Sequence, residues 1–236
     1  MTAIFAHRGC HGVPAPRENT IEAFAAARRA GADGVELDGL ATADGALAVH
    51  HDRRVPGAGD VTNICAAELP DDVPLLDAAL DACAGLGVNV EIKGGPADAV
   101  LVARLLLARG RAPGASPAGV LVSSFVAESL AALHEVAPHV PAGLLVDWRR
   151  DPRRALADAV RLGCATLHPF VTQVDAVLVD AVRKEGVGLH VWTVNAHDDL
   201  VTMGALGVDA VITDRVAAAI GVLRPWRAPT DGAPGG

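Results

Sequence analysis

Two of the most apolar stretches of the sequence contain pairs of charged residues spaced two apart. Glu36 and Asp38 lie in GVELDGL, and Glu91 and Lys93 lie in VNVEIKGG. In a β-strand, side chains two residues apart point to one face, so each pair would project in one direction. Buried carboxylates are costly unless they are paired, hydrogen-bonded or bound to a cation. Three carboxylates that meet at neighbouring strand ends would suit a hard divalent ion such as Mg²⁺ or Ca²⁺, with Mn²⁺ as a further option.

The same charges also allow a structural interpretation. Glu36 could pair with an arginine, and Lys93 with Glu91, as ion pairs that serve only the fold. We favour the metal site because two such charged strands occur in one chain, both near one end of the architecture predicted below.

Two histidines stand where apolar runs end. His7 and Arg8 follow the run AIFA, and His51 closely follows ALAV. Histidine is the natural general acid or base near neutral pH, so one of the two could act as the base and the other as the acid. The planar guanidinium of Arg8 could bind a phosphate oxygen.

Other candidates carry weaker signals. Trp192 in VWTVN could be a packing residue or an apolar wall against the carbon skeleton of a substrate. Ser124 lacks a surrounding GxSxG turn, which argues against a serine hydrolase. His168 is a weaker site candidate, and the remaining histidines, His11 among them, have no neighbours that suggest a role.

Strand-like and helix-like stretches alternate along the whole sequence. The predicted strands are 3–7, 34–40, 88–93, 120–124, 142–146, 165–168, 188–194 and 210–213. The predicted helices are 20–30, 75–84, 97–109, 127–136, 152–162, 173–185, 197–206 and 216–223. This alternation predicts an α/β protein, most economically a single-domain (β/α)₈ TIM-type barrel. A doubly wound open sheet is the alternative, but no glycine-rich phosphate loop follows an early strand.

Two segments depart from this rhythm. Residues 52–75 form a loop rich in Pro, Gly and Asp, which we expect to cover the barrel mouth. Residues 225–236 have the composition of a disordered C-terminal tail, so the barrel domain is predicted to span residues 1–224.

Charge and hydropathy limit the possible partners. The formal net charge is −8, which argues against binding to nucleic acid. No apolar run is long enough to span a bilayer, so stable membrane insertion is not expected. The candidate site starts at residue 7 and leaves no room for a secretory signal, which favours a cytoplasmic location. The oligomeric state does not follow from the sequence.

Taken in order, the motifs resemble those of the glycerophosphodiester phosphodiesterase family, in its compact cytosolic bacterial form. The matching segments are AHRG, ENT, ELD, HHD, EIK, SSF, VWTVN and GVDAVITD. The resemblance implies a TIM-type barrel that hydrolyses glycerophosphodiesters to sn-glycerol 3-phosphate and an alcohol. It further implies the following roles: His7 and His51 as the acid/base pair, Glu36, Asp38 and Glu91 as metal ligands, Arg8 and Lys93 as phosphate contacts, and Trp192 as part of the substrate wall.

The sequence departs from the family pattern at two places. Arg17 stands where the family usually has proline before ENT, and Arg215 and Val216 follow ITD where a proline is usual. Neither change touches a residue with an implied catalytic role. The resemblance also implies that the nucleophile is the glycerol hydroxyl beside the phosphate, although direct attack by water stays open.

Two other functions remain open. A lysophospholipase D-type enzyme would use the same site on a lipid that keeps one acyl chain. A non-catalytic barrel that binds a phosphate ligand would tolerate the loss of one histidine, yet both are present.

Overall fold

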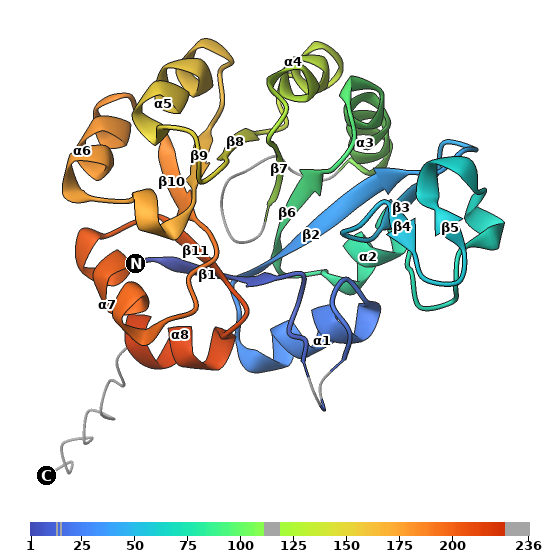
Figure 1. The fold of residues 1–236 in the computed structure, drawn as a ribbon, viewed down its shortest axis with the longest axis horizontal. Helices are drawn as coiled ribbons and strands as arrows, with labels where there is room; N and C mark the ends of the chain where they lie inside the picture. The colour runs from blue at the N-terminus through green and yellow to red at the C-terminus, as the bar shows by residue number, and fades with distance from the viewer. Residues whose placement is uncertain (13, 15, 111–118, 225–236) are drawn as a thin grey trace, which may run out of the picture.

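Largely apolar stretches form strands that are buried on both faces, as a parallel sheet covered by helices requires. The computed structural model describes residues 1–12, 14, 16–110 and 119–224. The parallel strands are β1 (Ala3–His7), β2 (Gly34–Ala41), β6 (Gly87–Ile92), β7 (Val120–Ser124), β8 (Ala142–Val146), β9 (Thr166–Pro169), β10 (Gly188–Val191) and β11 (Ala210–Thr213). Because β1 pairs in parallel with both β11 and β2, the sheet closes into a ring (Figure 1).

A helix follows each strand of the ring and packs outside it (Figure 1). These helices are α1 (Ile21–Ala30), α2 (Leu76–Ala82), α3 (Pro96–Arg109), α4 (Ala127–Val136), α5 (Pro152–Arg161), α6 (Ala176–Lys184), α7 (His197–Leu206) and α8 (Val216–Leu223). The predicted single-domain (β/α)₈ barrel is therefore confirmed, and the open-sheet alternative is wrong because the ring is closed.

Some of the predicted elements were too long, among them one helix and one strand near the site. The helix predicted from residue 173 begins only at Ala176, because the Asp175 side chain accepts a hydrogen bond from the Leu178 amide and caps it. The preceding residues form a separate 3₁₀ turn, η3 (Val171–Gln173). The strand predicted over 188–194 ends at Val191, so Trp192 lies just beyond the strand.

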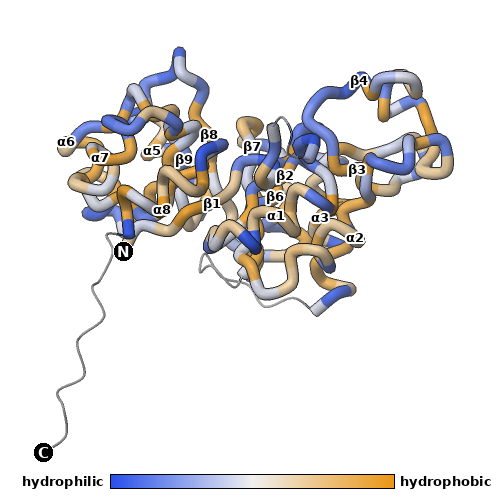
Figure 2. Tube along the Cα trace, turned by 90° about the horizontal axis from the view of Figure 1, so that it is seen from below, coloured by the Kyte–Doolittle hydropathy of each residue, from blue (hydrophilic) through white to orange (hydrophobic). Residues whose placement is uncertain are grey.

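The segment after β2 adds a small layer beside the barrel. It contains β3 (Leu47–Val49), which pairs antiparallel with the end of β2, a hairpin of β4 (Arg54–Val55) and β5 (Gly59–Asp60), and the 3₁₀ turns η1 (Val61–Asn63) and η2 (Ala66–Glu68). Leu40, Ala48, Val55, Val61 and Val73 form an apolar cluster of its own there. Figure 1 places β4 and β5 beside β2 and β3, outside the ring, and Figure 2 shows a hydrophilic stretch at β4.

The loop after β1 is held close to α1. Thr20 caps α1 by accepting a hydrogen bond from the Ala23 amide. Gly9 has φ of +81°, and a Cβ there would lie 2.7 Å from the backbone of Ala23. Glycine is therefore required after His7 and Arg8, both for its conformation and for the close approach of the helix.

Two further expectations concern the ends of the molecule and membranes. The predicted disordered tail, residues 225–236, lies outside the described residues. Among the helices that the structure describes, none combines the length and apolar character needed to cross a bilayer.

Candidate active site

Three carboxylates converge at the carboxyl ends of neighbouring strands. Glu36 and Asp38 come from β2, Glu91 comes from β6, and the register pairs Asp38 with Glu91. One oxygen from each lies within 4.8 Å of the other two. The Asp38 and Glu36 side chains are only 1% and 5% exposed, so the charges are largely removed from water.

This cluster carries more negative charge than its surroundings favour. Burial, together with repulsion from Asp38 and Glu91, raises the pKa of Glu36 well above its usual value. Burial and Asp38 likewise raise the pKa of Glu91 to about 7, although Lys93 opposes the shift. Asp38 Oδ1 is buried and accepts no hydrogen bond from any described residue. A set of carboxylate oxygens that includes a buried acceptor without a hydrogen bond fits a hard divalent cation.

Arg8 and Lys93 are the cations beside the cluster. Arg8 Nε lies 3.3 Å from Asp38 Oδ2, and its amide donates a hydrogen bond of 3.1 Å to Glu36 Oε2. Lys93 Nζ lies 2.8 Å from Glu91 Oε1 and 3.5 Å from Asp38 Oδ1. The Lys93–Glu91 ion pair of the structural interpretation is thus present, and it includes one of the candidate metal ligands.

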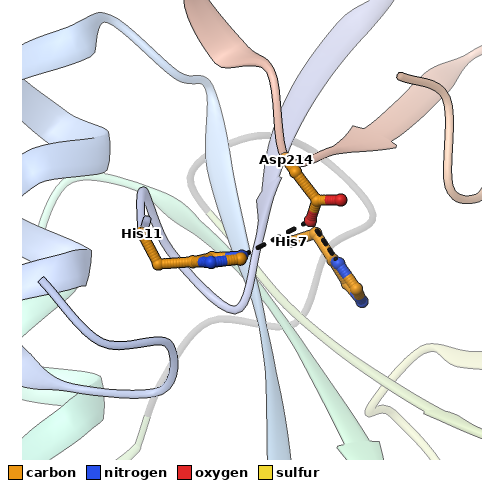
Figure 3. Close-up of side chains that lie close together, drawn as sticks. All are labelled: His7, His11 and Asp214. Carbon is orange, nitrogen blue, oxygen red and sulfur yellow. Dashed lines mark hydrogen bonds and ion pairs between the residues drawn. The ribbon is translucent and has the colours of Figure 1, made fainter. Parts of the chain in front are cut away.

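His7 lies at the end of β1 and is held by an aspartate from the other end of the chain. Its Nδ1 lies 2.6 Å from Asp214 Oδ1 (Figure 3). Its Nε2 lies 4.0 Å from Glu36 Oε2. Asn195 donates a hydrogen bond of 2.6 Å to the second oxygen of Asp214 and accepts one from its amide. With Nδ1 turned to Asp214, Nε2 is the nitrogen available on the side of the carboxylates.

His11 shares the same aspartate, which the sequence did not indicate. Its Nε2 lies 3.4 Å from Asp214 Oδ1 (Figure 3), and this contact raises the pKa of His11. Burial alone would raise the pKa of Asp214, but His11 and His7 together hold it well below its usual range. The expectation that His11 has no informative neighbour was wrong, because only barrel closure brings Asp214 next to it.

His51 follows β3 and faces the same cavity. Its Nδ1 lies 2.8 Å from Asp52 Oδ1, so this imidazole is also oriented by a carboxylate. Its neighbour His50 instead places Nδ1 2.7 Å from the Asp52 carbonyl oxygen.

A cavity of about 70 Å³ connects these groups. Its lining includes His7, Arg8, Glu36, His51, Glu91 and Trp192. Asp38 and Lys93 contact the lining residues, Asp38 through Arg8 and Lys93 through Glu91. All eight residues singled out in the sequence are therefore gathered at one site.

Trp192 forms an aromatic corner of this cavity. Its Nε1 donates a hydrogen bond of 2.7 Å to the His168 carbonyl, which fixes the indole. Phe125 and Phe170 pack edge-on against it, with ring centroids 5.5 and 5.3 Å away. His168 is itself fully buried beneath the site and bonds to Thr166 Oγ1.

Sequence reasoning missed several residues that contact the site. Asn19 donates a hydrogen bond of 2.7 Å to Asp38 Oδ2, and Glu18 accepts one of 2.9 Å from Arg8. Asn19 has φ of +57°, a left-handed conformation that asparagine tolerates well. The position of Glu18 and Asn19 in ENT, and of Asp214 directly after the last strand, was the available signal.

Comparison with known proteins gives a consistent picture. A glycerophosphodiester phosphodiesterase from Caldanaerobacter subterraneus subsp. tengcongensis is 32% identical, covering 94% of this chain and 98% of that protein. One from Bacillus altitudinis is 31% identical, covering 91% and 95%. The solved glycerophosphodiester phosphodiesterase from Agrobacterium tumefaciens is similar with a TM-score of 0.76 and 28% identity, covering 94% of this chain and 100% of that one.

An Oleispira antarctica phosphodiesterase, solved in complex with the product sn-glycerol-3-phosphate, has the same fold. Its TM-score is 0.80 at 23% identity, covering 93% of this chain and 97% of that one. The sequence profile of the glycerophosphoryl diester phosphodiesterase family matches residues 7–218. The match begins at the histidine of β1 and ends beyond the aspartate that orients it. This chain therefore belongs to the glycerophosphoryl diester phosphodiesterase family.

Proposed function

We propose that this protein hydrolyses glycerophosphodiesters to sn-glycerol 3-phosphate and an alcohol, in a reaction that depends on a divalent cation. Family membership and relatives near 30% identity support phosphodiesterase activity. The observation that carries the proposal is one cavity that joins two carboxylate-oriented histidines to a cluster of three carboxylates.

Glu36, Asp38 and Glu91 are the proposed ligands of the cation. When bound, a divalent ion would neutralise negative charge on the phosphoryl oxygens. Mg²⁺, Ca²⁺ and Mn²⁺ all suit such oxygen ligands. Arg8 and Lys93 are the proposed contacts to the phosphate, since both are charged and lie beside these carboxylates.

His7 and His51 are the proposed acid/base pair. One takes the proton of the attacking hydroxyl as the hydroxyl oxygen bonds to phosphorus. The other gives a proton to the leaving alkoxide as the bond between phosphorus and that leaving oxygen breaks. Both imidazoles turn Nδ1 to an aspartate, which leaves Nε2 for this exchange. The attacking group is either the glycerol hydroxyl next to the phosphate, followed by opening of the cyclic phosphate by water, or water itself.

Trp192, braced by Phe125, is the proposed wall for the carbon skeleton of the substrate. The domain limits 1–224, the cytoplasmic location and the lack of nucleic-acid binding also stay proposals.

The proposal is tested by release of glycerol phosphate from glycerophosphocholine. Chelator-treated protein should be inactive and should recover with added Mg²⁺, Ca²⁺ or Mn²⁺. His7→Ala and His51→Ala should each lower kcat by roughly 10²–10⁴-fold because each removes a proton-transfer group. Removal of the exposed His139 in His139→Ala is the matched control.

Three outcomes would contradict parts of this proposal. Near-normal kcat in either site variant would remove that histidine from its role. Full activity after chelation would show that the reaction does not depend on a divalent cation. Binding of glycerol phosphate without turnover under any of these metals would favour the non-catalytic phosphate-binding barrel.

A lysophospholipase D-type activity is the second candidate. Large apolar side chains are exposed after β7 and β8: Phe125 is 39% exposed and Trp148 is 59% exposed. Such side chains could contact an acyl chain. Turnover of lysophosphatidylcholine that exceeds turnover of glycerophosphocholine, and falls in Phe125→Ala, would favour this candidate.

A further inference from the structure

Asn89 and Ser123 are polar side chains in the floor of the candidate active site, and the mechanism above does not use them. Both line the cavity. Asn89 is 1% exposed and Ser123 is 0% exposed. Both polar atoms of the Asn89 amide, and Ser123 Oγ, are buried without a hydrogen-bond partner among the described residues.

The strand register fixes where these groups lie. Asn89 is the β6 neighbour of Glu36, and Ser123 is the β7 neighbour of Glu91. Asn89 precedes Glu91 by two residues, so it points to the same side of the sheet, one pleat deeper in the barrel. The next strand places Gly143 beside Ser123, so no side chain from that position covers the hydroxyl.

Buried polar groups in proteins are nearly always hydrogen-bonded, because leaving them unpaired is costly. The floor offers an amide donor, an amide acceptor and a hydroxyl that can do both. It carries no charge, unlike the groups above it. The cavity of about 70 Å³ also exceeds the 10–15 Å³ or so that one water needs. A neutral ligand group with several hydroxyls matches this floor better than a phosphate or an ammonium.

We propose that Asn89 and Ser123 bind the free hydroxyls of the glycerol unit. They would thereby favour a glycerol ester over an ester that lacks the terminal hydroxyl. This inference rests on the proposed function and names the substrate feature that the site recognises. A site that hydrogen-bonds a substrate hydroxyl rejects an analogue lacking it, because its own buried groups are then left unpaired.

The test compares glycerophosphocholine with the diester that has propane-1,2-diol in place of glycerol. This analogue keeps the hydroxyl beside the phosphate and loses only the terminal one. The parent protein should prefer the glycerol compound by about tenfold or more in kcat/KM. In Asn89→Leu and Ser123→Ala, that preference should fall about fivefold or more, chiefly through loss of activity on the glycerol compound.

Ser124→Ala is the matched control. Ser124 is equally buried on the same strand, but its Oγ donates to the Ile92 carbonyl and does not line the cavity. Its loss should leave the substrate preference unchanged, whatever it does to stability. Thermal unfolding of each variant checks folding, and Ser123→Ala, which removes a single atom, decides the matter if Asn89→Leu does not fold.

A binding measurement separates this inference from the proposed function. The Kd of sn-glycerol 3-phosphate is compared with that of propane-1,2-diol 1-phosphate by calorimetry, in the parent and in Ser123→Ala. A lower selectivity in Ser123→Ala would support hydroxyl binding by the cavity floor, even if the parent protein cleaved neither diester. The absence of cleavage would contradict only the proposed function. The inference would be overturned if the variants kept the parent's preference for the glycerol compound in both kinetics and binding, or if they lost activity and affinity equally on both compounds. In that case Asn89 and Ser123 would bind ordered water and not the substrate.

Discussion

At the scale of single residues, the candidate acid/base histidines share one arrangement. His7 turns Nδ1 to Asp214, and His51 turns Nδ1 to Asp52. The two aspartates differ in their surroundings, since the Asp214 side chain is 30% exposed and that of Asp52 is 73% exposed. A less exposed carboxylate holds an imidazole more firmly, because fewer waters compete for its oxygens. His7 is therefore the more tightly oriented of the pair.

Replacing Asp214 with asparagine should impair His7 without removing it. The new side chain would be similar in size, but its amide could present a donor to Nδ1 and favour the wrong tautomer. We expect Asp214→Asn to lower kcat by roughly 10²-fold or more, with a smaller change in KM. Steady-state kinetics on glycerophosphocholine measures this split. Asp180→Asn, on the exposed face of α6, is the control, and equal kinetics in the two variants would contradict the positioning role.

At the scale of elements, the helix after β1 supports the site through its first residues. Thr20 caps α1 and also donates to the Arg17 carbonyl, which closes the turn that carries Glu18 and Asn19. Those two residues contact Arg8 and Asp38. The cap thus connects helix stability to the geometry of the carboxylates.

Removing this cap should weaken both the helix and the site. Thr20→Ala is expected to lower the free energy of unfolding by about 0.5–2 kcal/mol, the usual cost of losing an N-cap. kcat/KM should fall as well, because Asn19 and Glu18 lose their support. Urea denaturation and kinetics measure the two effects, and Thr20→Ser, which keeps the hydroxyl, should restore both. An unchanged free energy of unfolding in Thr20→Ala would show that the cap does not stabilise the protein.

At the scale of the whole molecule, the interior of the barrel contains two buried histidines. His168 and His190 are buried there, with ring centroids 4.9 Å apart. Burial lowers the pKa of His190 to about 4 and that of His168 well below its usual value. Both imidazoles are therefore neutral in the folded barrel where they would be protonated in the unfolded chain.

This difference predicts a loss of stability in acid. Between about pH 6.5 and pH 4 the unfolded state binds more protons than the folded state, so the free energy of unfolding falls as pH falls. Each buried histidine adds about 1.4 kcal/mol per pH unit within its window. His190→Phe, which keeps a ring against Phe5, should make this fall shallower. Denaturation at several pH values measures the slope, and the two curves should run parallel above about pH 7.5, where residue His190 is neutral in both the folded and the unfolded state.

If the free energy of unfolding fell no more steeply with pH in the parent protein than in His190→Phe, the acid sensitivity would come from groups other than His190. Glu36 and Glu91 could not supply it, because their raised pKa values act in the opposite direction. A carboxyl with a raised folded pKa binds its proton more readily in the folded state, so its contribution to stability grows as pH falls.

Much of this arrangement followed from the sequence alone. Apolar strands alternating with helical stretches predicted the barrel, because strands buried on both faces must be covered by helices. The two-residue spacing of Glu36 with Asp38, and of Glu91 with Lys93, predicted which side chains share a face. Charged residues at strand ends indicated one rim of the barrel as the site.

Tertiary structure alone decided which of these groups touch and what surrounds them. Asp214 reaches His7 across 207 positions because the parallel register of β1 and β11 pairs Ala6 with Thr213, the residues just before them. Asn89 lies under the carboxylates because β6 aligns it with Glu36. Periodicity in a sequence specifies the face of a strand but not its register with a distant partner, since register depends on the packing of the closed ring.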